Sequence, residues 1–138
     1  PILTAICTAA LGGVDVQIIF PYKGDNAIVH SASMSYMKEV LEAGVKVYLY
    51  SDGFNHSKTM VVDGIMSSVG TANMDFRSFD QNFEVNAFIY DEGIANELID
   101  QFNEDRDHCI PLHLSRWQQR PIRRRLAESS SRLLAPLL

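Results

Sequence analysis

The dipeptide Asp63-Gly64 is the feature that most constrains how this chain can fold, because it separates two apolar runs. Residues 60–62 precede it and residues 65–69 follow it. An Asp-Gly pair between two apolar runs is a strong signal for a β-hairpin. The sequence therefore predicts a β-hairpin over residues 60–69.

Further strand signals lie on both sides of this hairpin. Residues 14–20 alternate between apolar and polar at first, end in a solid apolar run and stop at Pro21, which predicts a largely buried strand. Residues 45–50 and 85–90 are also predicted strands.

Helix signals separate these strands. A helix capped by Asp25 or Asn26 is expected to run to about Ala43, with Gly44 at its C-terminal turn. A second helix is expected from residue 93 to about residue 103. This order of elements predicts an α/β layered domain with a mixed β-sheet flanked by helices.

Charge divides the chain into two predicted parts. Residues 1–107 carry 6 Lys/Arg against 16 Asp/Glu, a balance of −10, whereas residues 108–138 carry 6 Arg against Glu128, a balance of +5. We therefore expect one domain over residues 1–107 and a basic C-terminal tail over residues 108–138. An acidic body is poorly suited to nucleic acid, which binds through basic residues, so nucleic acid is a disfavoured partner.

Other features bear on the context of the chain. No run approaches the roughly 18 consecutive apolar residues that a membrane span needs, and no signal peptide is recognisable. Residues 1–3 read as the interior of a helix and begin with Pro1 rather than Met, so we expect this chain to be the C-terminal piece of a longer one. Cys7 and Cys109 are expected to be unpaired thiols.

Residues suited to phosphoryl chemistry gather between positions 55 and 84. His56, Lys58 and Asp63 form the pattern H-x-K-x4-D, and Gly70-Thr71-Ala72-Asn73 and Asn82-Phe83-Glu84 follow the hairpin. The first pattern alone arises by chance in roughly one chain of this length in a hundred. Together with G-T-x-N after a hairpin, the chance falls below about one in a thousand.

These side chains suggest catalysis without a metal or another cofactor. If residues 56–58 form a strand, His56 and Lys58 point to the same face. An imidazole can attack phosphorus or protonate a leaving oxygen, and Lys58 can neutralise phosphate oxygens. Asn73 and Thr71 can donate hydrogen bonds to the same oxygens, and Glu84 can orient His56. On strand parity Asp63 faces away from the phosphate, so it is expected to support the site.

The motifs resemble the HKD motif of the phospholipase D superfamily, and their surroundings resemble the C-terminal half of bacterial cardiolipin synthases. The resemblance rests on segments that span nearly the whole chain: Gly44-Val45, residues 55–63, residues 70–75, Arg77-Ser78-Phe79, residues 82–86, Trp117, Arg120-Pro121 and residues 133–138. The HKD part is specific to the superfamily, whereas Arg77-Ser78-Phe79, Asn82-Phe83-Glu84 and the tail point more narrowly to the synthases. It implies a phospholipase D-like fold and a phosphohistidine-linked phosphatidyl group. It also implies a transferase that makes cardiolipin from two phosphatidylglycerols.

In that family two HKD motifs face each other: one histidine is the nucleophile and the other protonates the departing alcohol. This chain has one motif, so His56 would hold either role, and a partner is needed. We expect that partner to be an N-terminal HKD half of the same polypeptide, with a second copy of this chain as the alternative. The resemblance also implies that the full-length protein is in the bacterial inner membrane.

Two other functions remain open from the sequence. One is hydrolysis by a phospholipase D-type phosphodiesterase or a one-motif nuclease acting as a homodimer; the other is a lipid-binding piece without activity, which the intact His56, Lys58 and Asn73 disfavour. In the tail, Arg123-Arg124-Arg125 suggests attraction to an anionic membrane surface, although packing of a solvated helix explains the same charges.

Overall fold

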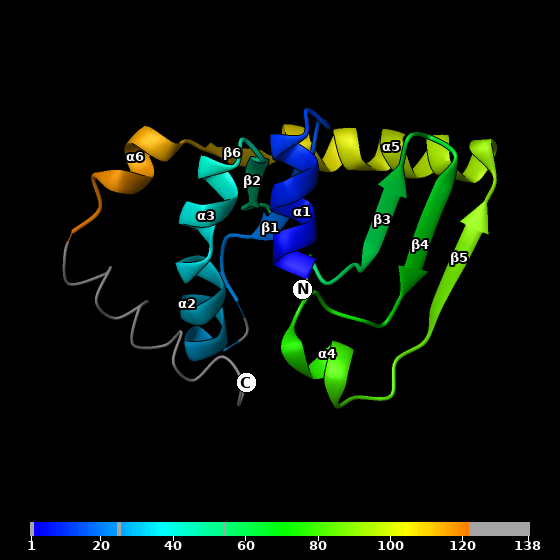
Figure 1. The fold of residues 1–138 in the computed structure, drawn as a ribbon, viewed down its shortest axis with the longest axis horizontal. Coiled ribbons are helices and arrows are strands. Elements are labelled where there is room, and N and C mark those ends of the chain that lie inside the picture. The colour runs from blue at the N-terminus through cyan, green and yellow to red at the C-terminus, as the bar shows by residue number, and fades with distance from the viewer. Residues whose placement is uncertain (1, 25, 54, 122–138) are drawn as a thin grey trace. The chain divides into compact units, whose positions relative to one another are not determined.

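The computed structural model describes residues 2–24, 26–53 and 55–121, which fall into two compact units (Figure 1). The first unit comprises residues 1–54 and 109–138, and the second comprises residues 55–108. The boundary expected at residue 107 stays a prediction. Arg123-Arg124-Arg125 and Asp25 lie outside the described residues.

The first unit is built on a mixed sheet with strand order β1–β2–β6. β1 (Gln17–Pro21) pairs in parallel with β2 (Lys46–Tyr50), and β6 (Cys109–Leu112) pairs antiparallel with β2. A parallel pair requires a crossover, which two successive helices provide. The helices of this unit are α1 (Ile2–Leu11), α2 (Ala27–Ser35), α3 (Met37–Glu42) and α6 (Leu114–Gln118).

The core of this unit lies between its sheet and its helices. Along β2, Val47 and Leu49 alternate with less buried residues and point inward. The cluster of buried apolar side chains consists of Met34, Met37, Val40, Val45, Val47 and Trp117.

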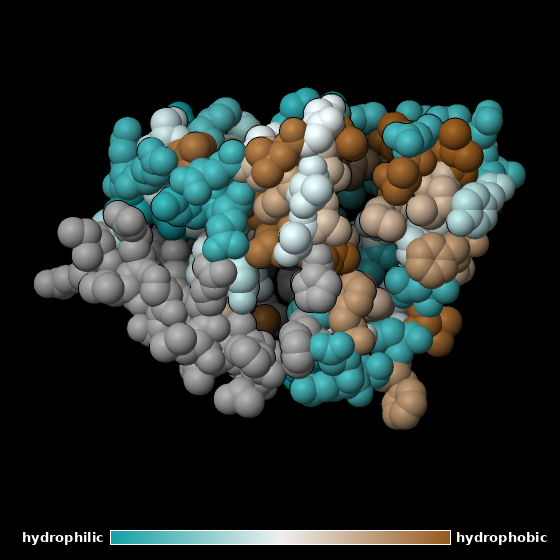
Figure 2. Space-filling view, in the orientation of Figure 1, coloured by the Kyte–Doolittle hydropathy of each residue, from teal (hydrophilic) through white to brown (hydrophobic). Residues whose placement is uncertain are grey.

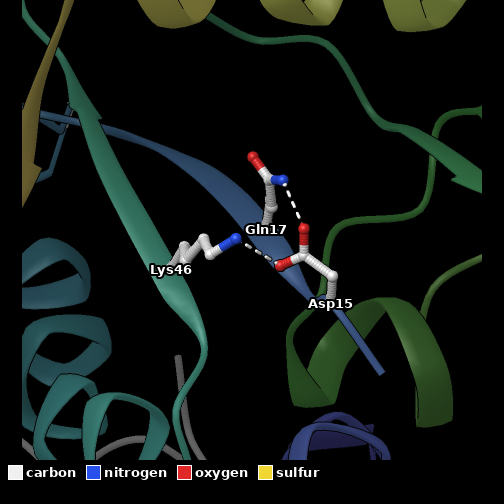
Figure 3. Close-up of polar contacts among 3 residues, drawn as sticks. All are labelled: Asp15, Gln17 and Lys46. Carbon is white, nitrogen blue, oxygen red and sulfur yellow. Dashed lines mark hydrogen bonds and ion pairs between the residues drawn. The ribbon is translucent and has the colours of Figure 1, made fainter. Parts of the chain in front are cut away.

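A polar contact fixes the start of the parallel pair (Figure 3). The Lys46 ammonium lies 2.7 Å from one oxygen of Asp15, and the Gln17 amide donates to the other oxygen at 2.9 Å. The hydrogen bond from Lys46, followed by that from Gln17, holds the pKa of Asp15 below its ordinary value of 3.8. These three side chains align the first residues of β1 and β2 in the register Gln17↔Lys46.

The second unit is an antiparallel sheet of order β3–β4–β5. At the turn that joins β3 to β4, Asp63 has φ 54° and Gly64 has φ 66°, which confirms the predicted hairpin. The elements of this unit are β3 (Thr59–Val62), β4 (Met66–Gly70), α4 (Phe76–Asp80), β5 (Asn86–Tyr90) and α5 (Glu92–Asp107).

Helix α5 packs against one face of the sheet through β3 and β4. Residues paired directly across the strands share a face, so the rows Met60–Ser68–Phe88 and Val62–Met66–Tyr90 lie together on one face. Phe88 and Tyr90 are 61% and 79% exposed there. We call the five apolar residues of these rows the open sheet face; apolar surface gathers over β3, β4 and β5 in Figure 2.

Two differences from the predicted elements have local causes. The single helix expected up to Ala43 is divided at Tyr36, where the Ser35 hydroxyl donates to the Ala32 carbonyl at 2.6 Å and competes with the helical pattern. Strand β6 was not predicted because Pro111 suggested a break. It pairs only with β2, and an edge strand tolerates a residue without an N–H.

The remaining helical predictions agree with the structure. The Asn26 side chain accepts from Val29 N–H at 3.3 Å, and Gly44 follows α3 with φ 91°. No disulfide joins Cys7 and Cys109. Among the helices that the structure describes, none combines the length and apolarity that crossing a membrane requires.

Ser67 provides a test of the packing between α5 and the sheet. Its side chain is 0% exposed, and its hydroxyl has no hydrogen-bond partner among the described residues, whereas the neighbouring Ser68 hydroxyl accepts from Asn86 at 3.4 Å. An unpartnered buried hydroxyl carries a desolvation penalty, so Ser67→Ala should stabilise the fold by about 1 kcal/mol in denaturant unfolding. Ser68→Ala is the matched control and should not stabilise it; equal gains from both variants would contradict the assignment.

Candidate active site

Three segments of the second unit meet at one end of its sheet. In an antiparallel sheet, the start of β3, the end of β4 and the start of β5 lie at the same end of the sheet. The Gly70 N–H donates to the Lys58 carbonyl at 3.1 Å, and the Thr71 N–H donates to the Val85 carbonyl at 3.0 Å. The segments that carry His56, Asn73 and Glu84 are therefore brought together at this end of the sheet.

The segment with His56 and Lys58 precedes β3, which begins at Thr59. His56 and Lys58 therefore do not lie on a strand, and the prediction of a shared strand face for them is wrong. An Asx-type turn holds this segment instead: the Asn55 side-chain oxygen accepts from the Ser57 N–H at 3.0 Å and from its hydroxyl at 2.7 Å. The Lys58 ammonium donates to the His56 carbonyl at 2.8 Å, and the His56 side chain is exposed.

Glu84 organises the loop that follows β4. One of its carboxylate oxygens accepts from the Thr71 hydroxyl at 2.5 Å, and the other accepts from the Ser78 hydroxyl at 2.8 Å. The Asn82 amide donates to this second oxygen at 3.3 Å. Thr71 also accepts from the Val85 N–H at 3.0 Å, so a single carboxylate connects the two ends of the loop between β4 and β5.

These hydrogen bonds favour the ionised form of Glu84. The bond from Thr71, and then that from Ser78, lowers the pKa of the Glu84 carboxyl below its ordinary value of 4.5, and the positive charge of Lys58 acts in the same direction. At neutral pH the site therefore contains a carboxylate that can accept further hydrogen bonds.

Asn73 is positioned through its backbone. Its N–H donates to the Ser78 hydroxyl at 3.1 Å, and Ser78 is fixed in turn because its own N–H donates to Asp75, the N-cap of α4, at 2.8 Å. The Asn73 side chain is exposed at the edge of the sheet.

Several residues of this network were absent from the predicted site. Ser78 and Asp75 act through the hydroxyl and carboxylate contacts given above, and Asn86 accepts from the Ala72 N–H at 3.2 Å. The motif Arg77-Ser78-Phe79 had been noted only as part of a resemblance, and Asp75 has the spacing of a helix cap before it. Capping logic applied to residues 75–78 could have identified Asp75 and Ser78.

Gly70 is required by the close approach of β5. A Cβ atom at this position would overlap the Asn86 side-chain amide and the Val85 carbonyl. Only glycine therefore allows β4 to pass next to β5 at the point where the site begins.

Asp63 lies at the opposite end of β3 from His56 and Lys58. It occupies the hairpin turn, so strand parity does not describe its orientation. The four residues of β3 span about 13 Å, which separates the Asp63 backbone from that of Lys58. The catalytic and phosphate-binding roles expected for His56, Lys58, Asp63, Glu84, Thr71 and Asn73 stay predictions at this point.

Charge makes Lys58 distinctive within its unit. Residues 55–108 contain 11 Asp/Glu but only three basic residues, Lys58, Arg77 and Arg106. Lys58 is thus the basic residue next to His56 in a strongly acidic unit. Among residues 2–24, 26–53 and 55–121, no three His, Cys, Asp or Glu side chains are grouped so as to hold a metal ion.

The Glu84 network predicts a pH-dependent contribution to stability. A carboxyl with a lowered pKa stabilises the fold at pH values above its unfolded pKa, and this contribution is lost as the pH falls through the folded pKa. Glu84→Gln should therefore be clearly less stable than the unmodified chain at pH 7, and the difference should narrow below pH 4.5. Glu97→Gln, on the exposed surface of α5, is the control; a difference that does not change with pH would argue against the network.

Comparison with known proteins places the chain in a family. Residues 1–106 match the model of the cardiolipin synthase PLD-like domain. The chain is 56% identical over 137 residues to the cardiolipin synthase of Geobacillus thermodenitrificans and 50% identical over 137 residues to the major cardiolipin synthase ClsA of Bacillus subtilis. These alignments cover 99% of this chain but only 27% and 28% of the two relatives.

A solved structure supports the same assignment at the level of the fold. The phospholipase D family member Nuc from Salmonella typhimurium superimposes with a TM-score of 0.74, covering 81% of this chain and 73% of Nuc at 21% identity. The predicted phospholipase D-like α/β fold is thereby confirmed. On the family match and the identities to its relatives, the chain belongs to the cardiolipin synthase PLD-like domain family.

Proposed function

We propose that this chain supplies one half-site of a phosphatidyltransferase that makes cardiolipin from two molecules of phosphatidylglycerol. The observation that carries the proposal is the meeting of the His56, Asn73 and Glu84 segments at one edge of a sheet, in a chain of this family. Because the chain spans about a quarter of its relatives' length, the activity belongs to a larger assembly.

The reaction proceeds in two balanced steps. An imidazole nitrogen attacks the phosphorus of one phosphatidylglycerol, an N–P bond forms, and the P–O bond to glycerol breaks while a second histidine gives the glycerol its proton. That second histidine then accepts a proton from the glycerol hydroxyl of another phosphatidylglycerol, whose oxygen displaces the nitrogen. The products are cardiolipin and glycerol, and His56 holds one of the two histidine roles.

The other predicted residues divide into two groups. Lys58 supplies positive charge and Asn73 supplies amide N–H groups to the phosphate oxygens, which carry increasing charge in the transition state. The ionised Glu84 orients an imidazole by accepting its N–H. Thr71 has one hydroxyl proton, which it donates to Glu84, so we assign it a positioning role. Asp63 supports the hairpin.

The second histidine requires a partner. The open sheet face supports this requirement, because Phe88 and Tyr90 expose large apolar surface beside the apolar Met60 and Val62. We propose that an HKD half encoded upstream in the same polypeptide is the partner, with a second copy of this chain as the alternative. Because phosphatidylglycerol is a lipid of the bilayer, we place the complete protein at the bacterial inner membrane.

Replacement of His56 tests the catalytic assignment. In an assembly that contains both motifs, His56→Ala should lower cardiolipin formation from phosphatidylglycerol by about 10³-fold, the order expected for loss of a nucleophile or general acid. Lipid extraction and mass spectrometry measure the products, and His113→Ala, at the exposed start of α6, is the control. Undiminished cardiolipin formation by His56→Ala would refute the assignment.

The identity of the product separates transfer from hydrolysis. The proposal predicts cardiolipin and glycerol from phosphatidylglycerol alone. Phosphatidic acid as the sole phospholipid product would instead establish the alternative phospholipase D-type hydrolase.

Dilution tests the need for a partner. The isolated chain should lose activity per molecule as dilution removes its assemblies, since one motif cannot supply both histidines. Tyr90→Asp should shift this loss to concentrations about tenfold higher, because it places a charge on the open sheet face. Leu11→Asp, at a site that is 73% exposed in the first unit, is the control. Sedimentation and activity are measured together; repeated turnover by a demonstrably monomeric sample would contradict the half-site.

A further inference from the structure

A cavity of about 500 Å³ is lined by residues of the first unit, whereas the sequence motifs that carry the proposed chemistry belong to the second. Its described lining comes from the loop after β1, from α2, β2, β6 and α6, and from Arg120. This volume lies in the range of sites that bind small molecules.

The inner wall of the cavity is apolar. Met34 on α2, Leu49 on β2 and Trp117 on α6 line it and are only 4%, 6% and 5% exposed. Met34 and Trp117 also belong to the core cluster, so this wall is fixed by core packing. A rigid apolar wall of this kind suits an alkyl chain.

Positive charge gathers at the same cavity. Its described lining includes Lys23, Arg116 and Arg120 and contains no Asp or Glu, although the chain as a whole has a net charge of −5. Lys23 and Arg116 are exposed and form no ion pair with any residue in the described ranges. An anion that binds here would offset the repulsion between these positively charged side chains.

Arg120 is held in place against the apolar wall. Its Nε–H donates to the Trp117 carbonyl at 3.0 Å, and its guanidinium carbon lies 3.0 Å from the centroid of the Trp117 ring. A guanidinium stacked on an indole is restrained by a cation–π interaction. The contact between Arg120 and Trp117 therefore marks the place where the basic part of the cavity lining meets the apolar part.

The loop after β1 closes tightly onto α2 beside the cavity. A Cβ atom on Gly24 would lie 2.7 Å from the Cβ of His30, a distance that requires glycine at this position. His30 in turn stacks on Phe20, with ring centroids 5.7 Å apart. This packing fixes the loop that carries Lys23.

We propose that this cavity binds an anionic lipid phosphate together with the first carbons of its alkyl chains. The phosphate contacts Lys23 and Arg116, whose donors suit phosphate oxygens, and the alkyl carbons contact Met34, Leu49 and Trp117. The proposal rests on the proposed function for the class of ligand, a phospholipid, but it does not require that His56 be catalytic.

Trp117 provides the measurement, because it is the only tryptophan in the chain and it lines the cavity. The 138-residue chain is titrated with dihexanoylphosphatidylglycerol below its micelle concentration while tryptophan fluorescence is followed. Saturable binding is expected, at least about tenfold tighter than that of dihexanoylphosphatidylcholine, whose choline cation is repelled by the basic residues, or of inorganic phosphate, which has no alkyl chains. Isothermal titration calorimetry provides a second readout that does not depend on the indole.

Charge variants locate the binding. Arg116→Gln and Lys23→Gln should each weaken phosphatidylglycerol binding about fivefold to tenfold, and both residues are exposed, so the fold should persist. Lys38→Gln removes the same charge from α3, where Lys38 pairs with Glu42 at 3.6 Å, and should change the affinity less than about twofold. Equal losses in all three variants would overturn the site in favour of general electrostatic attraction.

The remaining outcomes are also decisive. Inorganic phosphate that binds as tightly as the lipid would overturn the lipid assignment, and so would the absence of saturable binding. In an assembly that contains both motifs, lipid binding without transfer would reject the proposed catalysis alone, whereas phosphatidylglycerol binding that persists unchanged after loss of Arg116 and Lys23 would reject this cavity alone.

Discussion

The carboxylate of Glu84 is the interaction on which the candidate site depends. It accepts hydrogen bonds from Thr71 near one end of the β4–β5 loop, from Ser78 on α4 and from Asn82 near the other end. Ser78 accepts from the Asn73 N–H, so the residue expected to bind phosphate is held by the same network. Ordering a loop of this length costs considerable conformational entropy, which these hydrogen bonds help to offset. The Ser78 hydroxyl and the Glu84 carboxylate therefore hold residues that are distant in the sequence together at one end of the sheet.

The charge distribution gives this arrangement its chemical character. Glu84 is ionised because its donors and Lys58 lower its pKa, and Lys58 lies in a unit with 11 acidic residues. A phosphodiester approaching this unit meets little positive charge other than that of Lys58, which limits non-specific attraction to polyanions. The first unit has the opposite local feature, a cavity with three basic residues and an apolar wall.

The sequence was informative where local chemistry decides structure. Asp63-Gly64 predicted the hairpin, and Gly44 predicted the end of a helix. The His56-x-Lys58 part of the first pattern and the G-T-x-N pattern mark segments that meet at one end of the sheet, whereas Asp63 lies at the other end of β3. The sequence was less informative where tertiary contacts prevail. Pro111 lies in an edge strand that exists because β2 accepts it, and Ser35 divides a helix through its own side-chain hydrogen bond. Strand parity was applied to His56 and Lys58 although their segment is held by Asn55, and the contributions of Ser78 and Asn86 depend on pairings between distant residues.

Detection of the covalent intermediate is the most direct test of the account as a whole. An assembly with both HKD motifs would be mixed with phosphatidylglycerol, quenched in base during turnover and digested for mass spectrometry, because phosphohistidine chemistry is the step that distinguishes this site from simple lipid binding. The account predicts a phosphatidyl group on one histidine, either His56 or its counterpart in the second motif. Steady production of cardiolipin without phosphorus on either histidine would contradict it.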